Sequence, residues 1–195
     1  MWKHIKIALK LSFITLLILG LFYPLAITGL AQIFFPEQAN GSLIKKDGQI
    51  IGSELIGQQF TQPKYFHPRP SAAGDGYDAS ASGGSNFGPT NKKYIEEIKN
   101  NILLITKENP SLANGKIPTD MLTASASGLD PDISLANAYA QVPRVARARD
   151  MSKDSIIKIV NSCIINRQLK IFGEPRVNVL KINLMLDDLD QKATE

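Results

Sequence analysis

An uncharged, apolar run near the N-terminus dominates the pattern of the sequence. It covers residues 11–35, and a helix of that length, rising about 1.5 Å per residue, exceeds the roughly 30 Å hydrocarbon core of a bilayer. The first charge after the run is Glu37, and the charged side chains before it are all lysines: Lys3, Lys6 and Lys10. By the positive-inside rule, we predict a cytoplasmic tail over residues 1–10, a transmembrane helix over residues 11–35 and an extracytoplasmic domain over residues 36–195.

A cleaved secretory signal is the alternative for this run. Gly29, Leu30 and Ala31 place small residues at the spacing that a signal peptidase reads. The run continues through Phe35, however, and is longer than the usual signal core of about 7–15 residues. We therefore favour an uncleaved anchor.

Small and polar residues recur at every fourth position of the predicted membrane helix: Gly20, Pro24, Thr28 and Gln32. Such a stripe lets another helix approach closely and offers polar groups across the interface. It predicts packing against a membrane partner, although a plain anchor in the lipid bilayer also tolerates these residues. Pro24 is expected to kink the helix.

The remaining pattern predicts an α+β fold, in which one mixed domain with long Gly/Ser/Pro-rich loops follows the membrane helix. Short apolar runs on either side of a Lys-Asp-Gly turn predict a hairpin over residues 43–51. Apolar residues at three- and four-residue spacing predict a helix over residues 91–108.

Two more helices are predicted from their capping residues. Ser134 should cap a helix that Pro143 interrupts or kinks, and Ser152 should cap the helix that carries Cys163. Residues 177–186 alternate well enough for a strand, which we favour, although a helix fits almost as well.

Two loops interrupt this periodic pattern. Residues 65–91 lie in a stretch, from Thr61 to Tyr94, without any Leu, Ile, Val or Met, and residues 123–132 form a shorter stretch rich in small residues. A segment so poor in aliphatic residues has no apolar face for a helix or strand. Both loops contain the sequence Ala-Ser-Ala-Ser-Gly, but their flanks do not align, so the chain is no repeat protein.

Charge and composition exclude several classes of function. The three leading lysines account for all but about one unit of the formal net charge of +4, and the predicted domain lacks the clustered basic face that binding to nucleic acid requires. Cys163 is the only cysteine, so no internal disulfide forms. It shares a helical face with isoleucine and valine, which predicts a buried thiol.

Catalytic motifs are scarce. His4 and His67 are the two histidines, so an anchored hydrolase, the least favoured function, would depend on His67. The sequence has no Gly-x-x-x-x-Gly-Lys-Ser/Thr phosphate loop. One cysteine and one usable histidine make a poor metal site. We assign neither a catalytic residue nor a metal ligand.

Motifs along nearly the whole chain resemble one protein family, the C subunits (KdpC) of the Kdp-type potassium-transporting P-type ATPases of bacteria. The matching segments occur in family order: 23–25, 35–36, 39–42, 52–53, 55–58, 65–66, 69–72, 82–86, 123–130, Gln141, 143–146 and 177–180. The resemblance implies an accessory, non-catalytic subunit in the bacterial inner membrane. Its expected partners are a pore-forming subunit, a hydrolytic subunit and a very small membrane subunit.

Two further points bear on this function. The phosphorylation motif Asp-Lys-Thr-Gly of the hydrolytic subunit is absent from this sequence. The alternative from another class is a solitary membrane-anchored extracytoplasmic protein that binds a peptide or a glycan in a cleft formed by the aromatic loop.

The resemblance also implies a catalytic chaperone that raises the ATP affinity of the hydrolytic subunit. The implied nucleotide contacts are Ser82, Gly83, Gly84 and Gln141. Because ATP is cytoplasmic and the lysine pattern places these residues outside, we expect ATP to be bound by the hydrolytic subunit.

For the loops over residues 65–91 and 123–130 we predict a docking surface for the outer face of the pore subunit. Aromatic side chains would anchor it; the alternative is that about half of them fold inward. The predicted docking residues are Tyr65, Phe66, Arg69, Ser71, Tyr77, Ser82, Gly83, Gly84, Ser85, Asn86, Ser125, Ser127 and Asp130, with Phe87 as a further anchor. A less favoured hypothesis is that Asp75, Asp78, Asp130 and Asp132 gather potassium ions.

Overall fold

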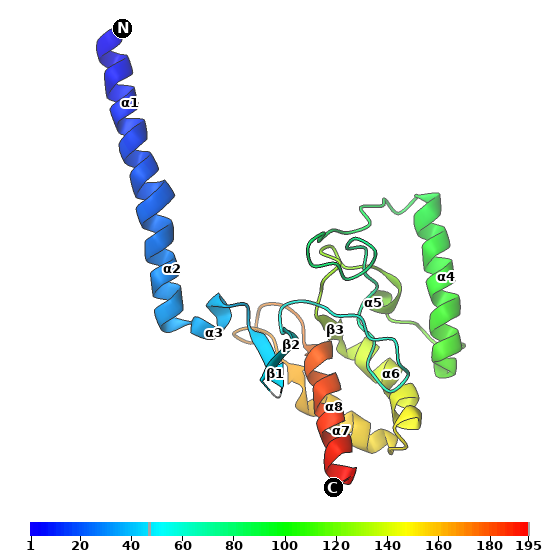
Figure 1. Ribbon diagram of the computed structural model, residues 1–195. Coiled ribbons are helices and arrows are strands. Elements are labelled where there is room, and N and C mark those ends of the chain that lie inside the picture. The colour runs from blue at the N-terminus through cyan, green and yellow to red at the C-terminus, as the bar shows by residue number, and fades with distance from the viewer. Residues whose placement is uncertain (47, 195) are drawn as a thin grey trace. The chain divides into compact units, whose positions relative to one another are not determined.

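The computed structural model describes residues 1–46 and 48–194 (Figure 1). The chain divides into two compact units, Met1–Ile51 and Gly52–Glu195. Each unit is described by itself. The predicted α+β class is confirmed, because helices and two small sheets make up the fold.

The first unit consists mainly of one apolar helix. It comprises α1 (Trp2–Leu17), the π-helical turn η1 (Ile18–Phe22) and α2 (Tyr23–Phe34). Trp2–Phe34 contains an 18-residue stretch with a mean hydropathy of 2.1 and is long and apolar enough to cross a membrane. The predicted helix is therefore present and begins nine residues earlier than the uncharged run.

The π-helical turn lies directly before Pro24. Proline has no amide hydrogen, and its ring clashes with the carbonyl four residues earlier in an α-helix, which is that of Gly20. A wider π turn makes room for the ring at this point. The helix thus accommodates the proline by a local change of winding.

The end of the first unit contains a short helix and a hairpin. α3 (Pro36–Ala39) precedes β1 (Leu43–Lys46) and β2 (Gln49–Ser53), which pair in a two-stranded sheet. The predicted hairpin is confirmed.

The second unit is built around a three-stranded antiparallel sheet in the order β3-β5-β4. Its strands are β3 (Asp132–Ser134), β4 (Ile164–Ile165) and β5 (Arg176–Asn178). Val177 of the central strand faces Ile133 on one side and Ile164 on the other. Apolar residues on all three strands thus share one register.

Three helices pack around this sheet, as Figure 1 shows: α6 (Leu135–Ala148), α7 (Lys153–Ser162) and α8 (Val179–Thr194). Their buried side chains form one core with the sheet, including Ile133, Val145, Ile156, Val160, Val177, Ile182 and Leu186. A further helical region precedes these helices in the chain. It comprises α4 (Lys92–Glu108), η2 (Pro110–Leu112) and α5 (Thr119–Leu122), with α4 lying beside α5.

The predicted capping residues are confirmed. The Ser134 hydroxyl accepts the amide of Asn137, and the Ser152 hydroxyl accepts the amide of Ser155. Each bond satisfies a donor that a helix N-terminus leaves unpaired. Pro143, however, does not interrupt α6, which continues to Ala148. The carbonyl that loses its partner belongs to Tyr139, a residue at the surface of the domain.

The strand predicted over residues 177–186 is wrong beyond Asn178. The Asn178 side chain accepts the amide of Lys181 at 3.1 Å and thereby starts α8. Val179, Ile182 and Leu186 are buried at the three- and four-residue spacing of a helix. The apolar face of this helix is broad. Residues on both of its edges are therefore apolar, and along the sequence they alternate as they would in a strand.

Cys163 follows the last turn of α7 and is half-buried, less deeply than predicted. Its thiol lies 3.7 Å from the sulfur of Met185. Burial raises the pKa of the Cys163 thiol, so it remains protonated at neutral pH.

Candidate functional site

The loops over residues 65–91 and 123–130, which we call the paired loops, lie against each other. The amide of Gly83 and the hydroxyl of Ser82 both donate to the carbonyl of Ser127, at 2.9 and 3.0 Å. The Ser71 hydroxyl donates to the carbonyl of Gly128 at 2.6 Å. The two segments that the sequence joined into one surface are therefore in direct contact.

Glycine is required where these backbones approach most closely. A Cβ on Gly84 would lie 2.9 Å from the carbonyl oxygen of Ala126, and one on Gly128 would lie 2.6 Å from the amide nitrogen of Ala73. Gly128 also has a φ of +68°, which L residues rarely adopt. A side chain at either position would separate the loops.

Polar side chains within the paired loops fix their shape. Arg69 forms an ion pair with Asp130 at 3.0 Å, and the Ser71 hydroxyl accepts the amide of Tyr77 at 2.8 Å. The Tyr77 hydroxyl donates to the carbonyl of Arg69, and burial raises the pKa of Tyr77 to about 12. Ser125 is buried. Most of the predicted docking residues thus bind one another.

The aromatic residues divide between core and surface. Phe66 is fully buried in the main core, so its prediction as a surface anchor is wrong: its apolar ring gains more by leaving water. Tyr65 is half-buried and donates its hydroxyl to Asp187 at 2.9 Å; burial, then this bond, raise its pKa. Phe87 is 39% exposed and remains available for a partner.

Four buried or half-buried side chains, which we call the clamp, hold the segment over residues 63–67 at the start of the first loop. They come from α6, from the residue after it and from α8: Gln141, Arg144, Arg149 and Asn183.

Two of these side chains each bind both the backbone N–H and the backbone C=O of a single residue. A neighbouring β-strand would normally supply such bonds. Asn183 accepts the amide of Phe66 at 2.8 Å and donates to its carbonyl at 2.9 Å. Gln141 accepts the amide of His67 at 2.7 Å and donates to its carbonyl at 3.0 Å. The peptide groups of Phe66 and His67 are thereby satisfied although neither residue lies in a sheet.

The two arginines bind the carbonyls that remain in this segment. Arg144 donates to those of Pro63 at 2.6 Å and Tyr65 at 2.9 Å, and Arg149 donates to that of Lys64 at 2.8 Å. The guanidinium of Arg149 is itself held by Asp187 and Asp190. The segment is therefore fixed along its whole length.

Arg144 is almost fully buried, and its hydrogen bonds to oxygen go to neutral groups, including the amide oxygen of Asn109 at 3.1 Å. Burial lowers the pKa of Arg144 to about 10. Glu108 supplies a nearby negative charge, and its own pKa is lowered, first by a hydrogen bond from His67 and also by the charges of His67 and Arg144. The Arg144 guanidinium remains charged at neutral pH, and its role is to donate hydrogen bonds.

Three of the four residues implied as nucleotide contacts already use hydrogen-bonding groups within the domain. Gln141 is 1% exposed, and its amide oxygen and nitrogen are both fully used, by His67 at either end, by Arg144 and by Asn137. Ser82 and Gly83 both donate to Ser127. A nucleotide would have to break these bonds to reach the Gln141 amide, the Ser82 hydroxyl or the Gly83 amide.

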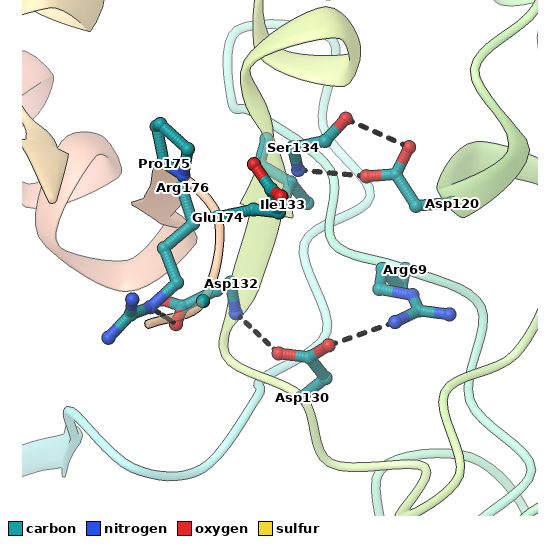
Figure 2. Close-up of a pocket in the computed structure, with 10 residues that line it drawn as sticks. Arg69, Asp120, Asp130, Asp132, Ile133, Ser134, Glu174, Pro175 and Arg176 are labelled. Carbon is teal, nitrogen blue, oxygen red and sulfur yellow. Dashed lines mark hydrogen bonds and ion pairs between the residues drawn. The ribbon is translucent and has the colours of Figure 1, made fainter. Parts of the chain in front are cut away.

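The aspartates proposed to gather potassium do not converge. Asp130 and Asp132 line a cavity of about 350 Å³, but Figure 2 shows Asp130 joined to Arg69, and Asp132 is paired with Arg176 at 2.6 Å. Asp75 and Asp78 lie outside this cavity, and the hydroxyl and amide of Ser80 lower the pKa of Asp78. In the described residues, no group of three His, Cys, Asp or Glu side chains is placed to hold a metal ion.

His67 is committed to the loop's own structure. Its Nδ1 lies 3.3 Å from the Glu108 carboxylate, and its Nε2 lies 3.1 Å from the carbonyl oxygen of Gln62. A hydrolytic triad would need that second nitrogen to face a serine hydroxyl. The geometry does not favour the hydrolase.

Sequence reasoning missed the clamp, although a signal was present. Asn137, Gln141 and Arg144 recur at helical spacing on a face that also carries Ala138 and Val145. Asn183 interrupts an otherwise apolar run from Ile182 to Leu186 in the same way. Polar residues on a buried helical face must find partners, so they indicate an irregular segment nearby.

The stripe on the apolar helix is exposed along its length within the first unit. Gln32, its last member, exchanges hydrogen bonds with Asn40 at 3.2 and 3.4 Å. Gly20, Pro24 and Thr28 have their surface free for another helix, as the prediction of membrane packing requires.

These observations define a class of protein: an apolar helix of membrane-spanning length joined to an α+β domain in which two long loops are hydrogen-bonded to each other. The chain matches the family described as "K+-transporting ATPase, c chain" over residues 5–188. It therefore belongs to this family, KdpC, and the resemblance noted in the sequence is confirmed.

Individual relatives agree with this assignment over their full length. The potassium-transporting ATPase KdpC subunit of Koribacter versatilis is 53% identical, with 100% of this chain and 99% of the relative covered. The KdpC subunit of Mycobacterium tuberculosis is 50% identical (97% and 100% covered) and that of Gemmatimonas aurantiaca 52% (97% and 94% covered). These relatives are named subunits of an ATPase, which does not fit the alternative of a solitary binding protein.

Replacing Gln141 by methionine tests the clamp. Because Met fills a similar volume but leaves the partners of Gln141 unpaired, we expect the free energy of unfolding to fall by about 3 kcal/mol or more. Urea unfolding of the purified full chain in detergent, followed by circular dichroism, measures it. The matched control is Gln59→Met at an exposed glutamine, with a change of less than about 0.5 kcal/mol. Equal stability of the two variants would show that Gln141 holds nothing in place.

Proposed function

We propose that this chain is an accessory subunit of a bacterial ATP-driven potassium pump and that it holds the pore-forming and hydrolytic subunits together. The observation that carries this proposal is the full-length family match, with about half of all residues identical to curated KdpC subunits. Potassium transport and ATP hydrolysis are then the work of the other subunits, and this chain contributes binding surfaces.

The first surface is the apolar helix. The three lysines before residue 11 and the uncharged run after them support an N-terminus in the cytoplasm and a domain over residues 36–195 outside the cell. Gly20, Pro24 and Thr28 would pack against a helix of the pore-forming or the small membrane subunit, because small residues permit close backbone contact.

The second surface is the exposed part of the paired loops. Ser85, Asn86 and Phe87 line a hollow of about 260 Å³ together with Tyr94 and residues 123–126. A protruding side chain of the pore-forming subunit would fit here. Phe87 takes over the anchoring role first assigned to Phe66, because it is the aromatic side chain of the loop with a large exposed face.

The clamp gives this surface its affinity. A loop that must become ordered on binding loses conformational entropy at that moment, whereas a loop already fixed by its own domain does not. Gln141, Arg144 and Asn183 hold residues 63–67 in place before any partner arrives. They position the docking surface without touching the partner.

ATP enters this proposal only through the hydrolytic subunit. Because both ends of the Gln141 amide and the N–H of Gly83 are already hydrogen-bonded within the domain, any chaperone effect on ATP affinity would be indirect. The chain would stabilise the subunit arrangement that binds ATP more tightly, through its membrane helix and docking surface.

Replacing Phe87 by glutamate tests the docking surface. A charge in the centre of an interface, together with loss of an aromatic anchor, should weaken binding by about 30-fold, equivalent to about 2 kcal/mol. Co-purification of the pore-forming subunit in mild detergent, over a dilution series, measures this. Leu104→Glu is the control, since Leu104 is also exposed but lies on α4. Retention of the pore subunit by Phe87→Glu at the control's level would contradict the assignment of the loops.

Cysteine labelling tests the topology. In a Cys163→Ala background, we expect Lys153→Cys to react with a membrane-impermeant maleimide in intact spheroplasts, because residue 153 is exposed at the start of α7. Ala8→Cys, in the predicted tail, should react only after the membrane is permeabilised. The reverse pattern would place the domain inside the cell and leave the family assignment unaffected.

A further inference from the structure

The segment between β4 and β5 contains an exposed turn over residues 168–172, which we call the tip. Gln168 and Phe172 pair as an antiparallel bridge, with hydrogen bonds of 2.9 Å in both directions between their backbones. The amide of Ile171 donates to the carbonyl of Gln168 at 3.0 Å and closes a four-residue turn. The tip is therefore an ordered hairpin.

The two central residues of this turn are an unusual choice. Leu169 has a φ of +50° and Lys170 a φ of +63°, both in the left-handed region. Hairpin turns of this kind normally carry Asn-Gly, because bulky L residues are disfavoured there. The sequence instead has long side chains at both positions, so the turn accepts strain and points those side chains away from the domain.

The side chains at the tip are among the most exposed apolar ones in the second unit. Leu169 is 83% exposed, Ile171 71% and Phe172 61%. Three such neighbours on one small projection form an apolar patch, and such patches mark interaction sites. The domain's own core does not account for them.

The charges around the patch are basic. Lys170 lies in its centre, Arg167 at its base, and residues 166–173 contain no acidic residue. Glu174, the first acid after them, is paired with Arg167 at 2.5 Å. Apolar side chains interspersed with lysine are typical of segments that lie in the interface of an anionic bilayer, where the lysine meets phosphate and the apolar groups reach the acyl chains.

We propose that the tip inserts Leu169, Ile171 and Phe172 into the interfacial region of an anionic phospholipid bilayer, with Lys170 at the headgroups. The chain itself supplies the reason for this occupant. Its helix Trp2–Phe34 is long enough to span a bilayer, and residues 35–51 alone lead to the second unit, so even a fully extended connection keeps the domain within about 60 Å of the membrane. This proposal goes beyond the role in the pump and does not depend on it.

Tryptophan fluorescence of the full chain in nanodiscs tests the proposal. Trp2 is the only native tryptophan, so Trp2→Phe with Phe172→Trp carries a single reporter at the tip. Trp2→Phe with Leu104→Trp is the matched control on α4, at another exposed apolar position. Nanodiscs of phosphatidylglycerol and phosphatidylcholine, or of phosphatidylcholine alone, would each be made with and without brominated acyl chains.

In anionic nanodiscs, we expect the brominated acyl chains to quench the fluorescence of the tip reporter about twofold more than that of the control reporter. Acrylamide in the solvent should quench the tip reporter less than the control reporter. The additional variant Lys170→Glu, or phosphatidylcholine alone, should reduce that difference, because attraction to phosphate is lost. If Phe172→Trp impairs folding, Leu169→Trp supplies the same readout.

Equal quenching of tip and control by both agents would overturn the proposal. A tip that becomes shielded only after the other pump subunits are added would also overturn it, because the patch would then dock on protein. Measuring the tip reporter before and after those subunits are added to the same nanodiscs distinguishes insertion into lipid from docking on protein.

Discussion

Segment 63–67 lies outside both sheets, and its peptide groups depend on side chains that reach it from α6, α8 and the residue after α6. A buried peptide group without a partner costs free energy comparable to a lost hydrogen bond. Gln141 and Asn183 therefore supply the hydrogen bonds that a neighbouring β-strand would make to Phe66 and His67. Arg144 and Arg149 bind the remaining carbonyls. The start of the first loop is fixed by this constraint, and contacts between the paired loops fix the rest.

The clamp also explains why a loop so poor in aliphatic residues can be rigid. Phe66 is its one large side chain in the main core, and beyond it small residues let two backbones lie in contact, with Ser127 and Gly128 as the acceptors. The outer side of the loop, with the exposed Phe87, is the surface that we propose for a partner. In an accessory subunit, a preformed surface would lower the entropy lost on assembly.

The sequence predicted the parts of the fold that depend on local patterns. The apolar helix, the hairpin, and the helices capped by Asn91, Ser134 and Ser152 all follow from periodicity and from side chains that bind nearby amides. Residues 179–186 were assigned wrongly because a helix with a broad apolar face can mimic alternation; the capping bond of Asn178 decides the outcome. For the site, proximity of the two loops was predictable, but the inward turn of Phe66 and the contacts of Gln141 join residues far apart in the sequence.

Native-state hydrogen exchange on the full chain tests the central claim most directly, namely that the clamp holds residues 63–67 as firmly as the core. The amides of Phe66 and His67 donate to Asn183 and Gln141, so they should exchange only on global unfolding, at rates close to that of Val177 in the central strand. The amide of Ser80, bound to an exposed aspartate, should exchange much faster. Exchange of Phe66 and His67 as fast as that of Ser80 would mean that the segment opens freely, and the preformed docking surface would be ruled out.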